Sequence, residues 1–88
     1  MKKFANNQEL SEYLVSLSSD LKARGAEQLS KVVDFARGQA VGMSTEFLGE
    51  SRIALRRVLE EKNGILKEQE RENLLDALRQ LDEAFDRR

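Results

Sequence analysis

The sequence predicts an all-α protein, a small antiparallel bundle of four helices. The composition favours helices, because the 88 residues are 35% charged and 40% hydrophobic and include no proline. Leucines recur three or four positions apart, the spacing that places them on one face of a helix. Glycine-containing breaks separate four such segments, expected at about residues 7–24, 26–41, 45–63 and 67–86 of a single domain over residues 1–88.

The first segment has the most regular apolar pattern. Its stripe consists of four leucines: Leu10, Leu14, Leu17 and Leu21. Asn6 is a suitable N-cap, and Glu9 three residues later completes a pair that resembles a capping box. Gly25 follows Lys22 and Arg24 and reads as the left-handed residue that ends a helix. The short break at Gly25 predicts that the first two helices are antiparallel neighbours.

The second segment places Leu29, Val32 and Val33 on one face, but Gly38 and Gly42 blur its end. We expect the chain to break between the second and third helices, because glycine inside a helix costs about 1 kcal/mol per position. In the alternative, both segments join into one long kinked helix and the bundle has three helices. The sequence leaves open whether residues 38–44 break the helix.

The last two segments form a second predicted hairpin. Ser44 or Thr45 is expected to cap the third helix, and Asn63-Gly64 is expected to end it. The fourth helix begins without a good cap, because the side chain of Lys67 cannot accept a backbone hydrogen bond. Its apolar face includes Leu75 beside the core positions. The predicted core of the whole bundle is Leu10, Leu14, Leu17, Leu21, Leu29, Val32, Val33, Leu48, Leu55, Val58, Leu59, Leu74, Leu78, Leu81 and Phe85.

No residue pattern indicates catalysis, and we expect a protein that is not an enzyme. Histidine and cysteine are absent, which removes the commonest general base, the thiol nucleophile and most transition-metal ligands. Glu68, Glu72 and Asp76 share one helix face, but acidic residues at this spacing are typical of a solvated surface. The sequence therefore predicts no cofactor and no metal site.

The third helix carries the candidate contact surface for a partner. Ile53 points away from the apolar face and is surrounded by Arg52, Arg56 and Arg57. An exposed aliphatic side chain among arginines is typical of the centre of a protein interface. The same arginines could contact phosphate, so a nucleic-acid-binding regulator is the alternative. The net charge of −1 argues against it, because nucleic-acid-binding domains are usually strongly basic.

Three further apolar residues lie outside the stripes: Tyr13, Val15 and Phe35. Each one singly is expected at the edge of the core, but together they favour self-association. The sequence thus predicts a small protein-interaction or regulatory module that forms a homo-oligomer or joins a larger assembly. The first seven residues begin with two lysines but lack the apolar run of a secretory signal, so we expect a cytoplasmic protein without a membrane segment.

Overall fold

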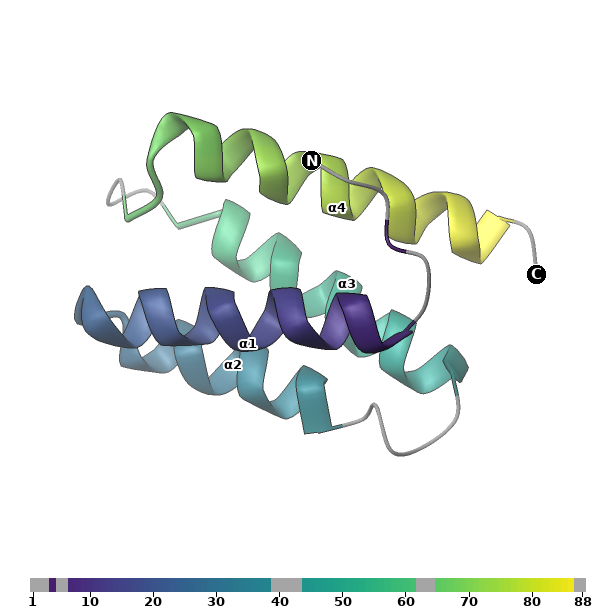
Figure 1. Cartoon of the computed structure of the whole chain (residues 1–88), viewed down its shortest axis with the longest axis horizontal. Coiled ribbons are helices and arrows are strands. Elements are labelled where there is room, and N and C mark those ends of the chain that lie inside the picture. Colours follow the sequence, from purple (N-terminus) through teal and green to yellow (C-terminus); the bar gives the residue numbers. More distant parts are fainter. Residues whose placement is uncertain (1–3, 5–6, 39–43, 62–64, 87–88) are drawn as a thin grey trace.

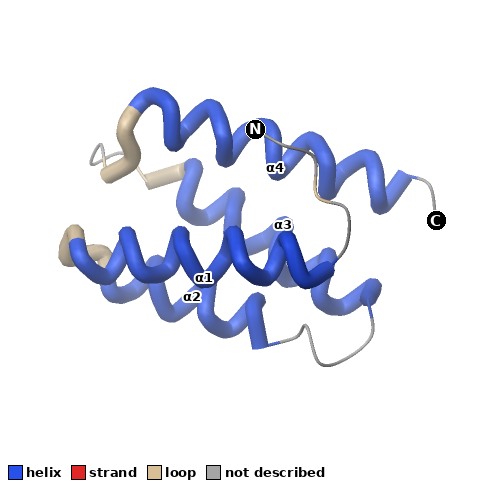
Figure 2. Tube along the Cα trace, in the orientation of Figure 1, coloured by secondary structure: helices blue, strands red, loops and turns tan. Residues whose placement is uncertain are grey.

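A computed structural model of the chain shows four helices: α1 (Asn7–Ala23), α2 (Glu27–Gly38), α3 (Ser44–Leu59) and α4 (Glu68–Asp86). The structure describes residue 4 and residues 7–38, 44–61 and 65–86, and contains no strand in this part of the chain. Consecutive helices run in opposite directions (Figure 1) and pack against one another, α1 on α2, α2 on α3 and α3 on α4. The tube in Figure 2 shows the same helical bundle. This confirms the predicted fold class of four antiparallel helices.

Helix bounds agree with the expected ones to within one residue, except at the ends of α2 and α3. The second helix ends at Gly38 rather than residue 41, and the third ends at Leu59 rather than residue 63. After α3 the chain closes in a tight turn, in which the amide of Glu61 donates to the carbonyl of Val58 over 3.2 Å. The predicted cap at Asn6, the side chains of Ser44 and Thr45, the Asn63-Gly64 stop and the connection 39–43 lie outside the described residues.

Gly25 ends α1 as the sequence predicts. Its φ of 83° is in the left-handed region, which glycine adopts without the steric cost of a Cβ. The amide of Ala26 donates to the carbonyl of Leu21 (2.8 Å), and the amide of Gly25 donates to that of Lys22 (3.1 Å). These two bonds form a Schellman motif, which satisfies the last carbonyls of the helix and turns the chain into α2.

The start of α4 is capped from inside the helix. The carboxylate of Glu70 accepts a hydrogen bond from the backbone amide of Lys67 (2.8 Å), which is the returning half of a capping box. The same carboxylate binds Arg24, which follows α1, through two bonds of 2.7 and 2.8 Å. Arg24 also donates to the carbonyl of Ile65. Glu70 therefore links the start of α4 to the turn between α1 and α2.

The core runs along the facing sides of all four helices and contains most of the predicted positions. The buried hydrophobic residues are Leu10, Leu14, Leu17, Leu21, Leu29, Val33, Ala36, Phe47, Ala54, Leu55, Val58, Leu74, Ala77, Leu78 and Leu81. The predicted residues Val32, Leu48 and Leu59 are partly buried against this cluster. The side chain of Phe85 lies outside the described part. Leu75, expected on the apolar face of α4, is instead 41% exposed. Among the described helices, α3 alone packs closely against α4, so the covered stripe of α4 is narrower than its apolar pattern.

A buried polar cluster lies between α1 and α2. The hydroxyl of Ser18 donates to the carboxylate of Asp34 over 2.6 Å and lies 2.8 Å from the hydroxyl of Ser30. Ser30 in turn donates to the backbone carbonyl of Ser18. Both serines are buried, so water does not reach their hydroxyls and these bonds supply the hydrogen-bond partners that they need. Because they are directional, they set how α2 aligns along α1.

No helix in the described part of the chain is both long and apolar enough to cross a membrane.

Candidate protein-interaction surface

The structure divides the four predicted contact residues of α3 between two sides of the helix. Arg52 and Arg56 lie on the side facing α4, where both form ion pairs with Oδ1 of Asp82, at 3.3 and 3.5 Å. Ile53 is 55% exposed and Arg57 is also exposed. The ring of arginines expected around Ile53 is therefore incomplete, because Asp82 draws two of them towards α4.

Ile53 borders a shallow groove between α2 and α3 together with Phe35. We call this surface the α2–α3 groove; it has a volume of about 270 Å³ and is lined by Gln28, Lys31, Val32, Phe35, Glu50, Ile53 and Ala54. Val32 and Ala54 form its inner apolar part. Val32 packs against the core, and Ala54 belongs to it. The groove is thus an apolar strip on the outside of two packed helices, bordered by polar side chains.

Phe35 is one of the residues that the sequence interpretation placed wrongly. It was expected at the edge of the core, but 59% of its surface is exposed, which makes it the most exposed large hydrophobic residue described. Val15 on α1 is also exposed, at 45%, rather than at the core edge. Tyr13 does pack against the core, and its ring lies 5.7 Å from that of Phe4.

Three charged side chains accompany the groove: Lys31 on α2, and Glu50 and Arg57 on α3. Lys31 and Glu50 line it directly. Arg57 follows Glu50 by seven residues, or two helical turns, and so lies on nearly the same stripe of α3. None of the three forms an ion pair with another described residue. Their charges are available to a molecule that covers the groove.

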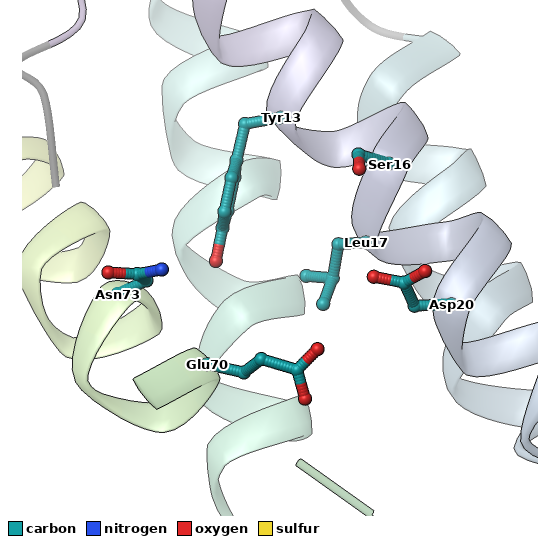
Figure 3. A pocket seen from close by; sticks show the side chains of 6 residues that line it. All are labelled: Tyr13, Ser16, Leu17, Asp20, Glu70 and Asn73. Carbon is teal, nitrogen blue, oxygen red and sulfur yellow. The ribbon is translucent and has the colours of Figure 1, made fainter. Parts of the chain in front are cut away.

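A second concave surface lies between α1 and α4, which do not pack closely along their length. This α1–α4 cleft of about 260 Å³ is lined by Tyr13, Ser16, Leu17, Asp20, Glu70 and Asn73. Figure 3 shows the side chains of Tyr13 and Leu17 from α1 facing Asn73 and Glu70 from α4. At one end the amide of Phe4 donates to Gln80 (2.8 Å), and at the other Arg24 holds Glu70.

Two ionisable groups of the α1–α4 cleft, Tyr13 and Glu70, have pKa values shifted away from neutrality. Hydrogen bonds from the Arg24 guanidinium and the Lys67 amide lower the pKa of Glu70 to about 2. Burial, and to a lesser degree the negative charge of Glu70, raises the pKa of Tyr13 to about 12. Tyr13 is therefore a neutral phenol and Glu70 a paired carboxylate at neutral pH. Neither has the pKa near 7 that suits a general acid or base.

Among the described residues, no three acidic side chains gather closely enough to hold a metal ion. Glu68, Glu72 and Asp76 do not form such a group. Asp76 instead pairs with Arg79 over 3.1 Å, as expected of a charged surface face.

No protein-family model, no curated protein and no solved structure matches this chain.

The placement of Phe35 and Ile53 along one groove was the part of the site that sequence reasoning missed. Each residue stands outside its own apolar stripe, and that signal is visible in the sequence. Their proximity depends on how α2 and α3 align, which helical periodicity within one segment does not specify.

Proposed function

We propose that this protein is a small non-enzymatic protein-interaction module that self-associates or serves as a subunit of a larger assembly, and that the α2–α3 groove is its contact surface. The observation that carries the proposal is the juxtaposition of Phe35 and Ile53, each more than half exposed, along one groove. Covering apolar surface contributes about 25 cal/mol per Å². A partner that covers both side chains would gain most of its affinity there.

The surroundings of the groove fit the usual anatomy of an interface. Aromatic and aliphatic anchors occupy the centre of such surfaces, and charged groups are found at the rim. Here Phe35 and Ile53 are the anchors, while Lys31 and Glu50 are rim charges. The α1–α4 cleft fits this role less well, because its lining is largely polar and Glu70 is already bound by Arg24.

The alternative, nucleic-acid binding through the arginines of α3, has less support. Arg52 and Arg56 both pair with Asp82, so a phosphate would have to compete with a carboxylate. Arg57 lies on the stripe of Glu50, which would repel phosphate. A basic surface of the kind that binds nucleic acid without sequence preference needs several unopposed cations.

The test is capture of binding partners, including differently tagged copies of the chain, from native lysate by the tagged protein with and without nuclease. We expect Phe35→Asp and Ile53→Asp to abolish capture of a stoichiometric protein. Val15→Asp is the matched control, because it introduces the same charge at an exposed apolar position on α1. Capture that all three variants retain would contradict the proposed surface. Loss of the captured material on nuclease treatment would favour nucleic-acid binding instead.

A further inference from the structure

Along α3, the stripe that borders the α2–α3 groove carries charges of opposite sign on either side of its apolar residues. Glu50 and Arg57 are separated by seven residues, which corresponds to about 10.5 Å along α3 and a rotation of only about 20°. Ile53 and Ala54 lie between them in the sequence and border the groove. This strip of α3 therefore carries an acidic residue, Glu50, then apolar residues and then a basic residue, Arg57.

Such a strip is complementary to itself under a two-fold rotation. In a two-fold interface each contact occurs twice, because residue i meets residue j and residue j meets residue i. A rotation axis that passes near Ile53 and Ala54, perpendicular to α3, exchanges the acidic and basic ends. It brings the apolar centre of one strip onto the apolar centre of the other.

We propose that a second copy of this chain occupies the α2–α3 groove, with the two α3 helices antiparallel and each Glu50 facing the partner's Arg57. This inference rests on the proposed function, since it names the occupant of the same surface. Phe35 borders the groove from α2 and would be covered in the dimer. The choice of a second copy follows from charge, because one chain supplies both the acidic and the basic residue that the contact requires. A partner of a single charge sign would face repulsion at one end of the strip.

The experiment is sedimentation equilibrium of the purified full chain over a concentration series. We expect a dimer whose dissociation constant rises at least about tenfold in Glu50→Arg alone and in Arg57→Glu alone, because each reversal opposes like charges twice per dimer. The double variant Glu50→Arg/Arg57→Glu should regain the parent affinity. Ile53→Asp should weaken the dimer by about 30-fold or more, the scale of a central anchor.

The most specific test mixes the two single variants, Glu50→Arg and Arg57→Glu. Each is self-repelling, but together they place opposite charges at both contacts, so the equimolar mixture should form a heterodimer. Glu72→Arg is the control for charge reversal, because Glu72 is an exposed glutamate on α4 outside the groove. Circular dichroism of every variant checks that the helices remain folded.

The outcomes separate this inference from the proposed function. A chain that remains monomeric overturns the second copy as occupant, while capture of another protein that depends on Phe35 and Ile53 would still support the interaction surface. A dimer that is insensitive to Ile53→Asp and to both reversals overturns the inference, because assembly then uses another face. Reversals that weaken the dimer without rescue in the double variant or the mixture overturn the antiparallel pairing of Glu50 with Arg57.

Discussion

The two helical hairpins differ in the hydrogen bonding of their buried serines. In the α1–α2 hairpin, Ser18 and Ser30 are buried but hydrogen-bonded to each other and to Asp34. In the α3–α4 hairpin, Ser51 is completely buried, and its hydroxyl has no hydrogen-bond partner in the described structure. The polar contacts between α3 and α4 are instead the partly exposed ion pairs of Asp82.

This difference indicates that the hairpins are aligned by different forces. Directional hydrogen bonds in a buried site penalise any shift of α2 along α1, because a shifted serine would be left unsatisfied. The second hairpin depends on apolar packing, since exposed ion pairs contribute little. We therefore expect the replacement of a polar residue to destabilise the first hairpin clearly. In the second hairpin, the same kind of change should cost little or should even stabilise the protein.

The largest effect is expected from core truncation, which should not distinguish the hairpins. Leu14→Ala in α1 and Leu55→Ala in α3 each remove a side chain with no exposed surface. Each should lower the free energy of unfolding by about 2–5 kcal/mol, measured by urea denaturation. Leu75→Ala is the control, because its side chain is 41% exposed and should change stability little. A Leu55→Ala variant as stable as the parent would mean that the buried face of α3 is misassigned.

Ser18→Ala should be the most damaging polar change. It removes the donor to Asp34 and a partner of Ser30, so we expect a loss of about 1–3 kcal/mol in chemical denaturation. Ser19→Ala is the matched control at an exposed neighbouring position. The double variant Ser18→Ala/Ser30→Ala should cost less than the sum of the single variants, because they share one network. Equal effects of Ser18→Ala and Ser19→Ala would argue against alignment by this cluster.

Ser51→Ala should have the opposite sign and stabilise the protein by about 1 kcal/mol. The substitution removes a buried hydroxyl without a described partner and introduces the best helix former. The thermal midpoint and the denaturant midpoint should both rise. A destabilised Ser51→Ala variant would show that the hydroxyl is satisfied in solution, and the contrast between the hairpins would disappear.

Glu70→Gln tests the contact between the hairpins. It should lower stability at pH 7 by about 1 kcal/mol, the scale of a lost helix cap. The pKa of Glu70 is lowered from its ordinary value of 4.5 to about 2, so its contribution is complete above pH 4.5. The difference between parent and variant should shrink as the pH falls from 4.5 towards 2, measured by denaturation across that range. A difference independent of pH would mean that the carboxylate charge is not responsible.

Asp82→Asn should have the smallest effect. The side chain of Asp82 is 43% exposed and that of Arg56 is 54% exposed, so solvent screens both of its ion pairs. We expect a loss below about 1 kcal/mol that diminishes further in high salt. A larger, salt-independent loss in thermal denaturation would show that ion pairs align α4 on α3 after all.

Features that depend on residues close together in the sequence were predicted more accurately than features that join distant residues. The leucine stripe of α1 and the left-handed Gly25 depend on neighbouring residues, and the structure confirms both. The start of α4 was expected to lack a cap, yet Glu70 supplies one within its own first turn, a signal present in the sequence and overlooked. Phe47 is not among the predicted core residues but is completely buried, because α3 contacts both α2 and α4.

The candidate site was predictable only in part. Ile53 was correctly expected to be exposed, since its angle on the helix places it away from the apolar face. The sequence could not assign Arg52 and Arg56 to Asp82, because that contact joins residues about thirty positions apart on different helices. Whether the surface binds a partner, and which one, remains a prediction for the experiments above.

The sequence by itself determined the four apolar segments, most of the residues that they turn inward and the glycine that ends the first helix. Such features follow from backbone geometry and periodicity, which act over a few residues. The tertiary structure alone decided that Phe35 and Ile53 border one groove, that Arg24 pairs with Glu70 and that Ser18 donates to Asp34. These three features depend on the relative alignment of the helices, which the packing of the whole core sets.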